Sequence, residues 1–109
     1  MKDFTNKNIL ITGAGSGIGR SLAIKFAEMG ATLILTDNNL NGLVASHEKI
    51  LTITAQCSYH HVDVSDYPAM QELSSAVFEK HGDIDVLINN AGVNLMDQFI
   101  DGNLDDFHW

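Results

Sequence analysis

Two patterns of apolar positions alternate along the chain. Short runs that are continuously apolar cover residues 8–11, 32–36, 58–62 and 86–88, and the third of these is the most polar. Continuous hydrophobicity over the length of a strand is typical of strands that are covered on both faces, as in parallel sheets. We therefore predict four buried strands at these positions.

The segments between these runs have the period of amphipathic helices. Their apolar stripes consist of Ile18, Leu22, Ala23, Phe26 and Ala27, then Leu40, Leu43, Val44 and His47, then Met70, Leu73 and Val77. Gly30 and Gly82 stand where the first and third helices would end, and Pro68 fits the first turn of the third helix. Either Ser65 or Asp66 can cap that helix. The order β-α-β-α-β-α-β predicts a parallel α/β sheet with right-handed crossovers.

A glycine-rich segment joins the first predicted strand to the first helix. It reads Thr12-Gly13-Ala14-Gly15-Ser16-Gly17-Ile18-Gly19. Glycines cost backbone entropy, but they permit a tight turn and let a ligand lie directly on the backbone. The first amides of the helix and its positive dipole end would face that ligand, so an anion such as a diphosphate fits. The alternative is a glycine-rich turn that holds no ligand.

The spacing of this segment excludes two other motifs. A phosphate-binding Walker loop ends in Gly-Lys-Ser/Thr, whereas this segment ends in Gly19-Arg20. A nucleophile elbow has Gly two residues on either side of its serine, where Ser16 has Ala14 and Ile18. Ser16 is therefore predicted to bind phosphate or to shape the loop rather than to act as a nucleophile.

Asp37 ends the second predicted strand, 18 residues after Gly19. Dinucleotide-binding units carry an acid about 20 residues beyond their glycines, where it accepts hydrogen bonds from the adenosine ribose. A carboxylate there repels a 2′-phosphate, and Asn38 rather than Arg or Lys follows it. This pattern predicts NAD as the cofactor and makes NADP less favoured. Alternatively, Asp37 or an asparagine after it caps the second helix.

Three signatures in chain order, together with Asp37, resemble those of the short-chain dehydrogenase/reductase family. The glycine segment is similar to the Thr-Gly-x-x-x-Gly-x-Gly cofactor loop of that family, and Asp63-Val64 to the Asp-Val pair after its third strand. Asn89-Asn90-Ala91-Gly92 is similar to the signature after its fourth strand. The resemblance implies one NAD(P)-binding domain over residues 1–109, a Rossmann-type doubly wound parallel sheet with four strands in the order 3-2-1-4. It also implies that Asp63 meets the adenine ring.

The candidate cofactor-binding residues fall at the carboxyl ends of the predicted strands, where doubly wound sheets bind their ligands. They are Gly13, Ser16, Gly17, Ile18, Gly19, Asp37, Asn38, Asp63, Val64, Asn90, Ala91 and Gly92. The side chain of Asn90 can bond neighbouring backbone where strands diverge, and Ala91 and Gly92 are small enough for a ligand to approach closely. The alternative for Asp63 is a turn or helix-start residue, and for Asn90 an ordinary strand exit.

The catalytic groups that the family uses are absent from the 109 residues. Its acid–base chemistry needs a Tyr with a Lys four residues later, but Tyr59 is followed there by Asp63 and Tyr67 by Gln71. We therefore predict the NAD-binding part of an oxidoreductase, truncated before the catalytic half, with no catalytic residue of its own. The resemblance implies hydride transfer to or from a small-molecule substrate in the complete enzyme, and a homo-oligomer. The alternative is a module that binds a dinucleotide or a partner without turnover.

Composition excludes several other classes. The net charge of −8, from 6 Lys and Arg against 14 Asp and Glu, argues against nucleic-acid binding. No apolar run reaches the ~20 residues of a membrane-spanning helix, and no secretory signal follows Met1. The single Cys57 cannot form an internal disulfide, which predicts a reduced, cytoplasmic location. The five histidines lack metal-binding spacing, so no metal site is predicted.

Overall fold

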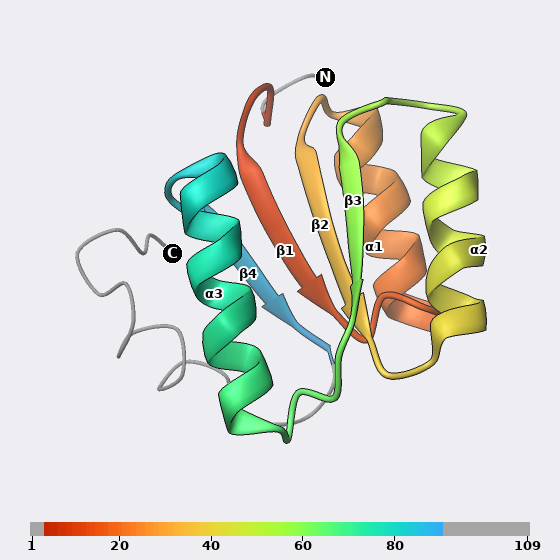
Figure 1. The fold of residues 1–109 in the computed structure, drawn as a ribbon. Coiled ribbons are helices and arrows are strands. Elements are labelled where there is room, and N and C mark those ends of the chain that lie inside the picture. Colours follow the sequence, from red (N-terminus) through yellow and green to blue (C-terminus); the bar gives the residue numbers. More distant parts are fainter. Residues whose placement is uncertain (1–3, 91–109) are drawn as a thin grey trace.

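The computed structural model describes residues 4–90 of the chain, and each predicted strand and helix forms within them (Figure 1). The elements in chain order are β1 (Asn8–Thr12), α1 (Gly17–Glu28), β2 (Thr32–Asp37), α2 (Leu40–Leu51), β3 (Cys57–His61), α3 (Tyr67–His81) and β4 (Val86–Asn89). The strand ends differ from the predicted ones by at most one residue.

The four strands form one parallel sheet in the order β3-β2-β1-β4. β1 lies between β2 and β4, so that Ile11 is opposite Leu35 on one side and Ile88 on the other. This is the predicted Rossmann-type topology. It brings the carboxyl ends of all four strands to the same edge of the sheet (Figure 1).

Helices cover both faces of the sheet, α1 and α2 on one face and α3 on the other (Figure 1). The cluster under α1 and α2 consists of Ile9, Ile11, Ala14, Ala23, Ala27, Ala31, Leu33, Leu35, Leu43 and Ile50. The cluster under α3 consists of Leu10, Ile34, Met70, Leu73, Val77, Ile84 and Leu87. Successive residues of a strand point to opposite faces, which explains why neighbours in β1 and β2 belong to different clusters.

Two residues assigned to the apolar stripes are exposed instead. Ile18 is 69% exposed and Leu40 is 44% exposed, whereas later members of the same stripes, Ala23 and Leu43, are buried. Ile18 and Leu40 lie in the first turns of α1 and α2. These turns start at the carboxyl edge of the sheet, and each stripe becomes buried only further along its helix.

The helix ends follow the sequence signals. Asn39 caps α2 and Asp66 caps α3, each with a side-chain oxygen that accepts a backbone N–H at 3.2 Å. Gly30 and Gly82 have positive φ angles of 90° and 80° beyond the ends of α1 and α3. Pro68 lies in the first turn of α3.

Asn8 fastens the start of β1 to the turn before β4. Its backbone N–H donates to the carboxylate of Asp85 at 2.8 Å, and its side-chain amide donates to the carbonyls of His81 and Asp83 at 3.0 and 2.9 Å. The backbone N–H of Asp85 in turn donates to the carbonyl of Asn8 at 2.9 Å. These contacts fix the register of β4 on β1.

No helix among residues 4–90 combines the length and the apolar character needed to cross a membrane. Within the same residues, no group of three or more His, Cys, Asp or Glu side chains is arranged to hold a metal ion.

Candidate functional site

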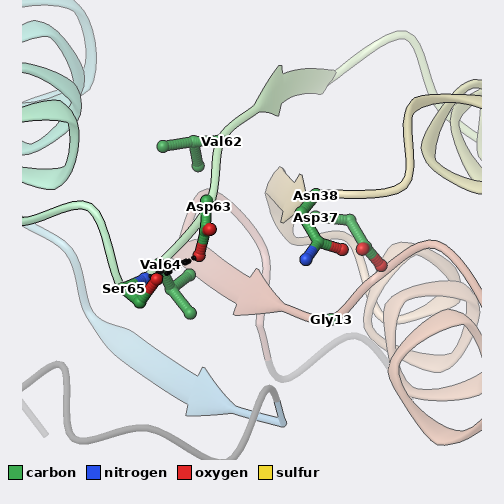
Figure 2. A pocket seen from close by; sticks show the side chains of 7 residues that line it. All are labelled: Gly13, Asp37, Asn38, Val62, Asp63, Val64 and Ser65. Carbon is green, nitrogen blue, oxygen red and sulfur yellow. Dashed lines mark hydrogen bonds between the residues drawn. The ribbon is translucent and has the colours of Figure 1, made fainter.

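A cavity of about 350 Å³ opens at the carboxyl edge of the sheet (Figure 2). Its lining consists of Gly13 after β1, Asp37 and Asn38 at the end of β2, and Val62, Asp63, Val64 and Ser65 after β3. The fold thus brings together five of the predicted cofactor-binding residues. Val62 and Ser65 were not predicted, although both flank the Asp63-Val64 pair in the sequence.

The glycines of the loop meet different constraints. Gly13 and Gly17 have positive φ angles of 63° and 55°, which favour glycine. A Cβ on Gly19 would collide with the carbonyl of Gly13, whereas a Cβ on Gly17 would meet nothing within 4 Å. Gly19 is therefore required by packing inside the protein, and Gly17 leaves open space at the start of α1.

That open space adjoins amides that α1 does not itself satisfy. Ser16 precedes α1 with extended backbone, and its side chain makes no capping hydrogen bond. The first turn of a helix leaves its N–H groups without intrahelical partners. Ser16, Gly17 and Ile18 are exposed, so an anionic ligand can reach this end of the helix.

Asp37 is an anchor of the glycine loop. One carboxylate oxygen accepts the backbone N–H of Gly15 at 2.7 Å, and the other accepts that of Asn39 at 2.9 Å. Asn39, not Asp37, caps α2. A carboxylate oxygen can accept more than one hydrogen bond, so both oxygens retain capacity for ligand hydroxyls while the amides hold the group in place.

Asp63 stabilises the turn after β3 and places a carboxylate at the cavity. Its Oδ1 accepts the backbone N–H and the hydroxyl of Ser65 at 2.9 and 2.7 Å (Figure 2). The hydroxyl bond and then the backbone bond hold the pKa of this exposed carboxyl below its usual range. Since both bonds use Oδ1, Oδ2 is the oxygen that a donor on a ligand would meet.

Asn90 ties the end of β4 to the glycine loop. Its side-chain amide donates to the carbonyl of Gly13 at 3.2 Å, and its backbone N–H donates to the hydroxyl of Thr12 at 2.9 Å. The expected bonding of Asn90 to neighbouring backbone is therefore present. Ala91 and Gly92 lie outside the described residues.

Arg20 and Ser46 contact the glycine loop from the side of α1 and α2, and neither was predicted as a site residue. Arg20 donates to the carbonyl of Gly15 at 2.6 Å, and the hydroxyl of Ser46 donates to that of Ala14 at the same distance. Nothing in the sequence pattern marks Arg20, because a cation on an amphipathic helix ordinarily faces solvent.

The chain matches the family model described as short chain dehydrogenase over residues 7–109. The chain belongs to the short-chain dehydrogenase family. A meso-2,3-butanediol dehydrogenase from Serratia marcescens is 37% identical over 107 residues, which are 95% of this chain and 41% of the relative. Human short-chain dehydrogenase/reductase 3 is 39% identical over 113 residues, covering 99% of this chain and 37% of the relative.

Two solved structures of oxidoreductases share the fold. NAD⁺-bound xylitol dehydrogenase superposes with a TM-score of 0.80 at 33% identity, covering 84% of this chain and 35% of that one. A metagenomic short-chain oxidoreductase in complex with NADP gives a TM-score of 0.78 at 33% identity, covering 83% and 41%. The chain therefore spans about two fifths of the length of the relatives that it matches.

Proposed function

We propose that this chain is the NAD-binding part of a short-chain oxidoreductase that transfers hydride between nicotinamide and a hydroxyl or carbonyl carbon. The observation that carries the proposal is the carboxylate of Asp37, held by the amides of Gly15 and Asn39 at the wall of the cavity. The two similar structures hold NAD⁺ and NADP respectively, so the family supports a nicotinamide cofactor in general. The choice of NAD rests on this chain's own residues.

The residues around the cavity fit the parts of a dinucleotide. The open start of α1 at Ser16 and Gly17 suits a diphosphate, because the first amides of a helix have no intrahelical partners and, with the helix dipole, attract anions. Asp37 suits ribose hydroxyls, while Asp63 offers an acceptor and Val64 an apolar contact to the adenine. The bound cofactor would supply the hydride chemistry, and these residues would bind and orient it.

Charge favours NAD over NADP at this site. Of the described residues that line the cavity, two are carboxylates, Asp37 and Asp63, and none is Lys or Arg. The 2′-phosphate of NADP would meet this negative charge at short range and would also remove a ribose hydroxyl that Asp37 can accept. Both effects act in the same direction.

Replacing Asp37 by Ala tests this proposal. Hydrogen bonds to a charged group contribute about 1.5–3 kcal/mol, so we expect Asp37→Ala to weaken NAD binding at least about tenfold. NADP binding should weaken less or improve. Calorimetric titration of the chain with both cofactors measures the two affinities.

Glu28→Ala is the matched control, because Glu28 is an exposed acid at the far end of α1 from the cavity. It should leave the ratio of the two affinities unchanged. A preference of the unmodified chain for NADP, or an unchanged ratio in Asp37→Ala, would contradict the assignment of NAD.

We further propose that the acid–base residues of the reaction lie outside these 109 residues, which contain no Tyr-x-x-x-Lys pair. The chain by itself then acts as a dinucleotide-binding module without turnover, the second candidate function. With NAD and a panel of alcohols, the 109-residue chain should form no reduced nicotinamide. The complete protein is proposed to be a cytoplasmic homo-oligomer that acts on a small molecule.

A further inference from the structure

Arg20 occupies an unusual position in the first part of α1. It is half-buried, and its guanidinium donates to the carbonyls of Gly15 and Gly42 at 2.6 and 3.1 Å and to the hydroxyl of Ser46 at 2.7 Å. These contacts join three segments: the glycine loop, α1 and α2. A planar guanidinium is suited to such simultaneous bonding because its donors form a rigid fork.

The contacts of α2 show how closely this assembly is packed. Ser46 is fully buried, and its hydroxyl donates to the carbonyl of Ala14 at 2.6 Å while accepting from Arg20. A Cβ on Gly42 would collide with the carbonyl of Gly15. The carbonyl of Ala14 is thus held by Ser46 from α2 and that of Gly15 by Arg20 from α1, while the N–H of Gly15 is held by Asp37.

The charge of Arg20 has no counterpart among the groups that it bonds. All three acceptors are neutral oxygens. A cation near the start of a helix also opposes the helix dipole, which favours acids there, and the first turn of α1 contains no acid. A purely structural clamp would not require a charge in this unfavourable place, whereas an anion that binds at the same helix end would be attracted by it.

We propose that Arg20 is a positioning residue for the diphosphate of the dinucleotide, acting through the glycine loop. It holds the carbonyl of Gly15, the residue whose N–H bonds Asp37, and it adds positive charge behind the loop. Ser46 is its neutral partner in the clamp. This inference rests on the proposed function, because it concerns the same dinucleotide site.

Binding measurements with and without phosphate in the ligand test the inference. We expect Arg20→Met to weaken NAD binding about tenfold, which is the scale of a lost charge-assisted interaction. Binding of adenosine, which has no phosphate, should weaken less than about threefold, since only the loop position matters to it. Arg20→Lys keeps the charge and should recover part of the NAD affinity.

Lys25→Met is the matched control, because it removes an exposed cation from the same helix at the end remote from the glycine loop. It should leave both affinities within about twofold of the parent. Ser46→Ala distinguishes the effect of the hydrogen bonds that Arg20 and Ser46 make to the loop from the effect of the Arg20 charge. It removes one neutral partner and leaves Arg20 in place. We expect a smaller loss of NAD affinity than in Arg20→Met.

A measurement without ligand examines the clamp directly. In Arg20→Met and in Ser46→Ala, the amide hydrogen of Gly15 should exchange with solvent faster than in the parent, whereas Lys25→Met should not change it. Circular dichroism of each variant confirms that it is folded before binding is compared.

The outcomes distinguish the two proposals. If the parent binds neither NAD nor adenosine, the proposed function fails. If the parent binds NAD and Arg20→Met binds it equally well, the proposed function stands and the inference about Arg20 is wrong. Equal losses of NAD and adenosine in Arg20→Met would also overturn it, because they would show a loop defect without a contribution of charge to the diphosphate.

Discussion

Gly17 and Gly19 are two residues apart in the first turn of α1, yet each disfavours a side chain for a different reason. A Cβ on Gly19 would strike the carbonyl of Gly13, and overpacking of this kind costs about 1–3 kcal/mol. A Cβ on Gly17 has space, and its φ of 55° costs about 1–2 kcal/mol for a residue other than glycine. We expect Gly19→Ala to lower the free energy of unfolding more than Gly17→Ala.

The same pair should separate stability from binding. In Gly17→Ala the new methyl group occupies the open space that we assign to the diphosphate, so the folded variant should lose most of its affinity for NAD. Urea unfolding and calorimetric titration of both variants measure the two effects. Unimpaired NAD binding by Gly17→Ala would place the diphosphate elsewhere.

Two histidines make stability depend on pH. Burial, followed by the charge of Lys80, lowers the pKa of His81, and burial followed by Lys80 and His81 lowers that of His60. The folded chain therefore binds fewer protons than the unfolded chain near the usual histidine pKa of about 6.5. Its free energy of unfolding should fall as the pH is lowered through and below this value.

Urea unfolding at about pH 7.5 and about pH 5.5 measures this loss, because the interval spans the usual histidine pKa. His81→Gln should make the two free energies more similar, since it removes one of the two groups. His61→Gln, at an exposed position, serves as the control. A free energy of unfolding that rises on acidification would show that the sign is wrong.

At the residue scale, the sequence indicates where site residues lie along the chain better than it indicates their hydrogen-bond partners. The place of Asp37 after the second strand was predictable from its distance to Gly19, and so was the bonding of Asn90 to backbone. The bond from the Gly15 amide to Asp37 was not predictable from the sequence, because it belongs to the tertiary packing in which Gly42 of α2 lies against Gly15. Arg20 was also missed, since two of its three acceptors are backbone carbonyls, which leave no trace in the sequence.

At the scale of single elements, the cap of α3 offers a direct test. The carboxylate of Asp66 accepts the N–H of Ala69 at 3.2 Å. Loss of such a cap costs about 1 kcal/mol, so Asp66→Ala should lower the free energy of unfolding by about that amount. Asp66→Asn keeps an acceptor oxygen and should retain most of the stability. If the two variants unfold alike, the cap does not stabilise the helix.

Strands and helix ends were predictable because their signals are local. Continuous apolar runs and capping residues act within a few positions of the chain. The exposure of Ile18 and Leu40 was not predictable, because it depends on where the sheet ends beneath each helix. A periodic stripe gives the face of a helix that is buried, but it does not show over which turns a neighbour covers that face.

At the scale of the whole molecule, the sheet edge at β4 predicts self-association. Among residues 4–90, β4 pairs with β1 alone, and its apolar run at residues 86–88 contains no Lys or Pro. Such edges pair readily with other chains. We expect the sedimentation coefficient of the 109-residue chain to rise with concentration. The mass of a monomer at every concentration would contradict this expectation.

The central place of β1 also has a consequence for the order in which the chain folds. β1 meets β2 across one helical crossover, but the contact of Asn8 with Asp85 joins residues 77 positions apart. Closing a longer loop costs more entropy, and distant contacts slow folding. We therefore expect β1, α1 and β2 to assemble early and β4 to dock last. During synthesis, the edge of β1 that pairs with β4 stays exposed until nearly ninety residues have left the ribosome. A chaperone would protect this edge during that interval.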